Sequence, residues 1–467
     1  MHKYLSFLLL LLTFSLQSQS NDTLVLQFNE FLGYVKKYHP IAKQAELTID
    51  IGQANLMKAR GGFDPKIEVD YNRKEFKNSN YYDRLNATFK IPTWYGVDFK
   101  GTYLQNEGEY LNPSDIVPEN GLYSAGISLS IGQGLWINDR MATLKQAKYF
   151  REQSKADRDL LINQILYEAS LAYFNWLQAF SQVEMFKSFL SNADIRFKGI
   201  KRRSESGDLA AIDTVEAKIT IQNRALSLEQ VQVEFVKRTL ELSNFLWINN
   251  NIPMELQSNV IPDKNIHGKI DTTLEILGKP LDSFDIETHP KLKSIGYKIK
   301  GLEVNKKLKA NKLLPKVKLE YNFLTDTPEY INTFQTYDYK GGLSLNLPLF
   351  LRRERGDLKL AKFKLQDAQF DLDNAEIKLK NKIVSIYYEL DSYETQMLLI
   401  NKIVLNYKTL LAAEERKFNF GESSLFLINS RESKLIDAKL KQIALQNKFF
   451  TTKARLFNSL VVNPKSL

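Results

Sequence analysis

The segments DPKIEVDYN at positions 64–72 and LPKVKLEYN at positions 314–322 are two versions of one short sequence. After the shared proline, apolar and polar residues alternate, which is typical of a β-strand with one apolar and one wet face. The likeness extends outward without a gap, because residues 39–72 and 289–322 are identical at nine positions and each stretch begins with His-Pro. The chain is therefore predicted to contain a duplicated structural unit.

Each copy of the unit is predicted to run from a leading helix through β-strands to a long helix, a glycine turn and a partner helix. The copies pair Gly126 with Gly342 and Gly207 with Gly421. The first repeat is expected over 21–248, with strands within 66–131, a long helix over 141–206 and a partner helix over 211–246. The second is expected over 289–460, with strands within 316–347, a long helix over 356–420 and a partner helix over 425–459. An irregular connector (249–288) separates the repeats, and a tail (461–467) follows them.

The alternating segments leave the number of strands and their surroundings open. Such strands fit a soluble antiparallel sheet, and they also fit a transmembrane barrel with an apolar outside and a polar inside. The first repeat is longer than the second between Asn72 and Tyr123, and the surplus holds two more alternating segments. These segments either add a hairpin, giving six strands per chain, or form an extracellular loop, leaving four. The alternation favours six.

The two long helices are the second decisive feature. Between 141 and 206 there is no proline and, before the end, only one glycine, Gly199. A helix of roughly 65 residues is about 100 Å long at 1.5 Å per residue, far beyond the usual three or four turns. Apolar and small residues recur at three- and four-residue steps along both helices, which indicates coiled-coil packing. One chain offers too few partners for such long stripes, so we expect oligomerisation.

Composition narrows the classes of protein. The chain has 467 residues, of which 25% are charged and 43% hydrophobic, and it has no cysteine, which excludes disulfides and thiolate nucleophiles. Residues 1–20 resemble a cleavable signal peptide, with Lys3 before an apolar core and Ser18 and Ser20 before the expected cleavage site. No other run is apolar enough for a membrane helix. A chain that spans a membrane without such helices needs a closed barrel.

Catalytic and ligand-binding patterns are not found in the sequence. The net charge of +10 comes from lysines interleaved with acids along helices, so we expect solvated faces and no nucleic-acid partner. His39 and His289 stand at equivalent helix ends, where the helix dipole explains them better than a metal site does. Glu414 and Glu415 are expected on a solvated helix face. The chain is predicted to be no enzyme and to hold no cofactor or metal.

In their order and spacing, these features resemble the TolC-like outer membrane efflux family. The local matches are the leading helix ending at His39-Pro40, the strand exit LPLF at 347–350, and the turns at 207–217 and 421–431. The resemblance covers nearly the whole chain after the signal peptide. It implies an α+β membrane protein, in which each chain supplies part of a trimeric transmembrane β-barrel that continues into a long antiparallel coiled-coil tunnel in the periplasm.

The resemblance also implies partners and a docking site. We expect a homotrimer in outer-membrane lipid, with a periplasmic extension whose tips meet a periplasmic adaptor and, through it, an inner-membrane pump. The residues expected at the docking tips are Gly207, Asp208, Asp213, Glu216, Gly421 and Glu422. In the best-known member of the family, acidic side chains six and nine residues after the second tip glycine close the periplasmic mouth. Those positions here are Leu427 and Ser430, whereas Asp213 and Glu216 occupy the equivalent places in the first repeat.

A basic cluster next to the first tip has two interpretations. Lys198, Lys201, Arg202 and Arg203 could meet an acidic adaptor surface or lipid headgroups, or they could form an ordinary solvated face. A different class of protein is also compatible with the long helices, namely a periplasmic coiled-coil adaptor or scaffold with a small β domain. A duplicated strand–helix unit is not expected in such an adaptor, so the outer-membrane channel is the favoured interpretation.

Overall fold

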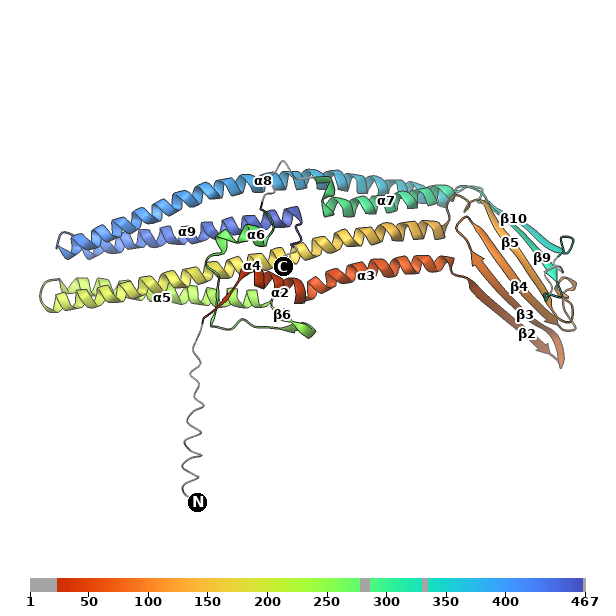
Figure 1. Ribbon diagram of the computed structural model, residues 1–467, viewed down its shortest axis with the longest axis horizontal. Helices are drawn as coiled ribbons and strands as arrows, with labels where there is room; N and C mark the ends of the chain where they lie inside the picture. The colour runs from red at the N-terminus through yellow and green to blue at the C-terminus, as the bar shows by residue number, and fades with distance from the viewer. Residues whose placement is uncertain (1–22, 278–285, 330–334, 465–467) are drawn as a thin grey trace, which may run out of the picture. The chain divides into compact units, whose positions relative to one another are not determined.

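The structure is a computed structural model that describes residues 23–277, 286–329 and 335–464 (Figure 1). The signal peptide expected over 1–20, residues 278–285 of the expected connector and residues 465–467 of the expected tail lie outside the described residues. The chain divides into two compact units. The sheet unit comprises Ala45–Leu160 and Asp285–Lys380, and the tip unit comprises Met1–Gln44, Leu161–Phe284 and Asn381–Leu467.

The sheet unit contains one six-stranded antiparallel sheet with the order β10-β9-β5-β4-β3-β2. The first repeat supplies β2 (Lys66–Phe76), β3 (Ser79–Pro92), β4 (Val97–Glu107) and β5 (Leu122–Gly132), and the second supplies β9 (Lys316–Thr325) and β10 (Tyr339–Asn346). The surplus segments of the first repeat are thus the β3–β4 hairpin, which lies inside the sheet and not in a loop. The two repeats meet where β5 pairs with β9, with Ile127 opposite Tyr321.

The two faces of the sheet differ in polarity, as the alternation predicts. Odd-numbered positions carry the apolar side chains, and even-numbered positions carry most of the polar ones. The apolar face is largely bare in the single chain, since Ile67 is 74% exposed and Leu343 is 72% exposed. An uncovered apolar surface of this kind is unusual for a soluble monomer and marks a face that meets lipid or another chain.

Helices of the sheet unit pack in a series through small apolar clusters. The series contains α3 (Pro40–Arg60), α7 (Pro290–Asn311) and the first parts of α4 (Asp139–Glu205) and α8 (Arg352–Asn419). Leu56 and Ala59 of α3 pack on Ala147 of α4, and Ala142 of α4 packs on Val304 and Leu308 of α7. Ile299 of α7 then packs on Leu365 and Ala368 of α8. Small residues at these contacts allow the helix axes to approach closely.

The tip unit holds the remaining parts of α4 and α8 with their partner helices α5 (Ala211–Ser243) and α9 (Leu425–Leu460). The partner helix expected over 211–246 ends three residues early, because the chain turns into a short strand at Trp247. The long helices have 67 and 68 residues, close to the expected bounds. Within the described ranges, no helix carries an apolar stretch long enough to cross a bilayer.

Short elements surround the middle of the tip unit, so the described part of the connector is not wholly irregular. They are α2 (Phe28–Tyr38), α6 (Ile270–Thr273), a parallel pair formed by β1 (Leu24–Leu26) and β8 (Val260–Pro262), and an antiparallel pair formed by β6 (Trp247–Ile248) and β7 (Ile252–Pro253). Tyr173 of α4 ties these pieces to the helices. Its buried hydroxyl donates to the Leu26 carbonyl at 2.7 Å and accepts from the Asp263 amide at 3.0 Å.

The two His-Pro sequences have the same structural role in each repeat. Nδ1 of His39 accepts a hydrogen bond from the amide of Ile41 at 3.2 Å, and Nδ1 of His289 accepts from the amide of Lys291 at 3.1 Å. Each histidine therefore caps the start of the helix that follows, α3 or α7, in addition to lying at the end of the element before it. Capping through Nδ1 needs a neutral imidazole, so the expected dipole effect on a charged ring is not the main role.

Candidate functional site: the hairpin tips

Both tips are built on the same backbone motif. Gly207 and Gly421 adopt left-handed conformations, with φ of 87° and 81°. The residue after each glycine donates its amide to a carbonyl five positions back, Asp208 to Arg203 at 2.8 Å and Glu422 to Lys417 at 2.9 Å. This is the Schellman motif, which ends a helix by satisfying its last carbonyls and requires a residue that tolerates positive φ. The repeat thus extends to the hydrogen bonding of the turns.

The expected acidic residues of the first tip have separate roles. Asp208 lies in the exposed turn, where Oδ2 accepts from the Ser206 hydroxyl at 3.3 Å. Asp213 lies in the first turn of α5, where the helix dipole favours a carboxylate. Glu216 reaches the other repeat, because its Oε1 accepts from Nδ2 of Asn429 on α9 at 2.8 Å. Of the three carboxylates, Glu216 therefore joins the first hairpin to the second.

The four residues of the expected basic cluster have different surroundings. Lys198 pairs with Asp194 at 2.6 Å, and Lys201 lies 3.9 Å from Glu205, each within one helical face. Arg203 is half-buried and stacks over the Phe418 ring of α8, with its Cζ 5.4 Å from the ring centroid. Arg202 remains exposed. The cluster thus contains two partly neutralised lysines, one free-standing arginine and one arginine that packs against the second hairpin.

The second tip presents aromatic side chains to solvent. Phe420, just before Gly421, is 81% exposed, and Phe426, in the first turn of α9, is 68% exposed. Leu427 and Ser430, at the offsets where the resemblance implies acids, are partly exposed and uncharged, and Glu422 stands in the open turn. The two tips thus have different chemistry although their backbones match.

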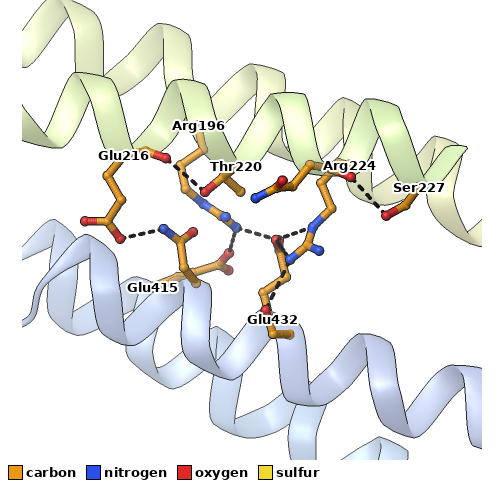
Figure 2. A network of polar contacts seen from close by, with 10 residues as sticks. Arg196, Glu216, Thr220, Arg224, Ser227, Glu415 and Glu432 are labelled. Carbon is orange, nitrogen blue, oxygen red and sulfur yellow. Dashed lines mark hydrogen bonds and ion pairs between the residues drawn. The ribbon is translucent and has the colours of Figure 1, made fainter. Parts of the chain in front are cut away.

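A buried network of charges joins the two hairpins behind the tips (Figure 2). Nη2 of Arg196 on α4 donates to Oε1 of Glu415 on α8 and to Oε1 of Glu432 on α9, both at 3.0 Å. Arg224 on α5 donates to Oε2 of Glu432 at 3.3 Å. Glu432 is only 1% exposed, and both arginine side chains are 13% exposed. Two arginines thus balance two glutamates, with one charged residue from each of the four helices.

The acidic pair at 414–415 is solvated only at Glu415, whose side chain is 43% exposed. Glu414 is buried, accepts from the Ser423 hydroxyl at 2.6 Å, and lies 3.5 Å from Nε of Arg431. The hydrogen bond from Ser423, together with Arg431, lowers the pKa of Glu414 below its ordinary value. The prediction was wrong for Glu414, because it considered one helix alone, whereas the partners of Glu414 come from the tip turn and from α9.

Sequence reasoning also missed Arg196, Arg224 and Glu432, although the sequence contains a signal for them. Glu432 stands between Ile428 and Leu435, at the helical spacing of buried residues. Arg196 lies between Ala193 and Ile200 in the same way. A charged residue inside an apolar stripe is a candidate for a buried pair, because an unpaired charge there is costly. The pattern does not identify the oppositely charged partner, because that partner lies on the other repeat and comes close only in the folded chain.

The tips also share an apolar core with contributions from both repeats. Phe186, Phe189 and Ile200 of α4 pack in one cluster with residues of α5, α8 and α9, among them Ala217, Leu411 and Ile436. The four helices therefore form one packed bundle in the tip unit. Among residues 23–277, 286–329 and 335–464, no group of three His, Asp or Glu side chains is placed to hold a metal ion.

Comparison with known proteins identifies the architecture. Residues 286–460 match the family model described as "Outer membrane efflux protein". The whole structure resembles the Campylobacter jejuni CmeC outer membrane channel, with a TM-score of 0.64 and 12% identity over 93% of this chain and 85% of CmeC. The chain has the TolC-like fold. A search of the curated proteins finds no significant match.

Two more structures with the TolC-like fold show the same extent of agreement. The outer membrane protein VceC of Vibrio cholerae matches with a TM-score of 0.63 and 12% identity, over 93% of this chain and 95% of VceC. The open state of the Neisseria gonorrhoeae MtrE outer membrane channel matches with a TM-score of 0.64 and 13% identity, over 96% of this chain and 93% of MtrE. The sheet, both repeats and the tips are therefore all parts of one TolC-like architecture.

Proposed function

We propose that this protein is an outer-membrane channel that provides a passive exit duct for efflux or type I secretion. The observation that carries the proposal is the bare apolar face of a six-stranded sheet within a TolC-like fold. A small soluble β domain, as in a periplasmic adaptor or scaffold, would bury that face. An outer-membrane strand instead exposes its apolar face to lipid and its polar face to a pore.

The edges of the sheet support closure by further copies. Within the described residues, β2 and β10 are each paired on one side only, and they have 11 and 8 residues. Long unpaired edges are unstable in lipid, because each free backbone group there costs several kcal/mol. Three copies with six strands each would close an 18-stranded barrel. Barrels of about 16 to 18 strands are wide enough to leave an aqueous channel.

An exposed seam on α5 supports the same assembly in the helical part. Ile212, Ile219, Leu226, Val233 and Leu240 follow one another at seven-residue steps, and each is more than half exposed. Val215 and Val236 lie on the same seam and are also exposed. A heptad of apolar residues is the pattern by which a helix packs in a coiled coil. In the proposed homotrimer, a helix of the neighbouring copy covers this α5 seam.

The tips are the proposed docking surface for a periplasmic adaptor, which in turn meets an inner-membrane transporter. Gly207 and Asp208 form the first turn, with Asp213 and Glu216 just behind it, and Gly421 and Glu422 form the second turn. Arg202, with Lys198 and Lys201, offers positive charge beside the first turn, and the aromatic side chains offer apolar contact at the second. The expected signal peptide over 1–20 agrees with export to the outer membrane.

One pair of substitutions tests the channel against a soluble sheet. Val69→Arg places a guanidinium on the face assigned to lipid, at a cost of about 2–4 kcal/mol near the bilayer midplane. Asp70→Arg places the same group on the adjacent, pore-facing position. We expect Val69→Arg to abolish the heat-modifiable trimer recovered from outer membranes, and Asp70→Arg to retain it. Recovery of the wild type in the soluble periplasm, or equal behaviour of the two variants, would contradict the proposal.

A further inference from the structure

We infer that the polar face of the sheet carries a cationic band that makes the channel select anions. The inference rests on the proposed function, because it takes the polar face to line a water-filled pore. Its basis is the strand register, which places lysines from distant parts of the sequence in one row across the sheet. The cargo class that such a band favours is small molecules or ions with net negative charge.

The lysine row crosses all six strands. Lys90 of β3 lies opposite Lys66 of β2 on one side and opposite Lys100 of β4 on the other. Four of the six positions are lysines, and the other two are uncharged. In the order β2, β3, β4, β5, β9, β10, the row consists of Lys66, Lys90, Lys100, Gly126, Asn322 and Lys340.

Other charges on this face do not cancel the row. The same register places four more basic residues there, Lys74, Arg84, Lys316 and Lys318, and four acidic ones, Glu68, Asp70, Asp98 and Glu320. Several of these acids already have partners, since Asp98 lies 3.3 Å from Lys90 and 2.8 Å from Arg140, and Glu320 is paired with Lys318. No carboxylate of the described residues is within ion-pair distance of Lys66, Lys100 or Lys340. These three lysines are therefore the members of the row without an ion-pair partner in the described part of the chain.

A segment of the β4–β5 connection lies over the polar face and narrows the space beside the row. Asp115 pairs with Arg84 of β3 at 3.2 Å, and its carbonyl accepts from Nδ2 of Asn106 of β4 at 2.7 Å. Between this segment and the strands lies a hollow of about 790 Å³, whose lining holds three basic residues, Arg84, Lys100 and Lys340, and three acidic ones, Asp70, Asp115 and Glu320. A solute that passes along the polar face is thus confined near the lysine row.

Charges in such a position act strongly on passing ions. A narrow aqueous space with low-dielectric walls focuses the field, and rings of lysine or arginine are the usual device of anion-selective pores. Screening at physiological salt has a range of about 8 Å, so only charges that border the path matter. Because barrel strands tilt by roughly 35–45° from the pore axis, the row becomes an oblique band, and three copies would repeat it around the pore.

The test is the reversal potential of the full-length protein in planar bilayers under a KCl gradient at neutral pH. We expect a reversal potential with the sign of an anion-preferring pore, with chloride several-fold more permeant than potassium. The triple variant Lys66→Gln, Lys100→Gln, Lys340→Gln should bring the permeability ratio close to unity. The matched control Lys66→Arg, Lys100→Arg, Lys340→Arg keeps the charges and should keep the wild-type ratio. Trimer migration on a gel checks that all three proteins assemble.

The possible outcomes distinguish a failure of the cationic band from a failure of the proposed channel. A conducting wild type that prefers potassium, or a conducting glutamine triple variant with unchanged selectivity, would overturn the cationic band while leaving the channel standing. A wild-type protein that fails to insert and conduct at all would overturn the channel itself, and the band with it. Loss of selectivity in the arginine control would show that the lysines act through their shape and not through charge, which also overturns the inference.

Discussion

Arg196 on α4 and Glu432 on α9 are 236 positions apart in the chain, and the guanidinium of one donates to the carboxylate of the other at 3.0 Å. The bond joins the hairpin of the first repeat to that of the second. Arg224 binds the second carboxylate oxygen of the same glutamate, so Glu432 is the common acceptor of the network. A buried pair of this kind adds little net stability but is costly to break from one side.

Removal of Glu432 should therefore destabilise the tip unit. Glu432→Ala leaves two nearly buried arginines with Glu415 alone, and we expect a loss of about 3–5 kcal/mol. Glu432→Gln keeps the shape and one acceptor and should lose less. Amide hydrogen exchange of α4 and α9 near the tips measures the effect. The control Glu205→Gln, at an exposed position 3.9 Å from Lys201, should change exchange little. Equal effects of Glu205→Gln and Glu432→Gln would contradict the importance of the network.

The tip glycines are expected to resist substitution because of their backbone conformation. Gly207→Ala and Gly421→Ala place a Cβ at a φ of 87° or 81°, which costs roughly 1–2 kcal/mol each. Gly199→Ala, inside α4 near its tip end, is the matched control, since its new Cβ would meet nothing within 4 Å. The helix should there gain about 0.5–1 kcal/mol. The unfolding temperature should fall for the two tip variants and rise for the control. A shift in the same direction for all three would contradict this explanation.

The Ser423–Glu414 hydrogen bond makes the second tip sensitive to acid. The pKa of Glu414 is lowered in the folded protein, so the stabilisation is fully present above the ordinary value of about 4.5 and is lost as pH falls through the folded value. Ser423→Ala should raise the pKa of Glu414, as measured by carboxyl chemical shifts in a pH titration. The control Ser424→Ala removes the N-cap of α9, which should weaken the tip equally at all pH values. An unchanged Glu414 titration in Ser423→Ala would refute the assignment.

The cap at His39 predicts a second pH effect, at milder acidity. Burial lowers the pKa of His39 below its usual 6.5, and the neutral ring is the form that accepts from the Ile41 amide. The unfolded chain therefore binds a proton first as pH falls below 6.5, and stability is lost until the folded value is reached. His39→Asn keeps a capping acceptor without a titrating ring. Its unfolding temperature should vary less between pH 7 and pH 5 than that of the wild type.

Much of the fold could be predicted because it follows from local periodicity. The alternation in 66–72 and 316–322 reflects strand geometry alone, and the long proline-free stretches reflect helix geometry. Gly207 and Gly421 could be placed at turns because glycine is the residue that most readily adopts a positive φ. The alternation also suggested the β3–β4 hairpin. Whether this hairpin belongs to the sheet or to a loop is decided only by its pairing with β2 and β5.

The parts that could not be predicted depend on contacts between distant segments. The burial of Glu414 is one case, because its partners, Ser423 and Arg431, lie outside the helix that carries it. The parallel pair of β1 and β8 is a second case, because the Tyr173 hydroxyl joins Leu26 of the first repeat to Asp263 of the connector. The lysine row is another case, because its members become neighbours only through the register of six strands.

The unequal division of the sheet has a consequence for how such channels can diversify. Four strands come from the first repeat and two from the second, and the surplus is one complete hairpin. A hairpin adds two strands, so all remaining strands keep their directions in the antiparallel sheet. The junction of β5 with β9 also keeps its register. Because barrel diameter grows with strand number, the bore of the proposed duct would widen by one hairpin per copy at each such step.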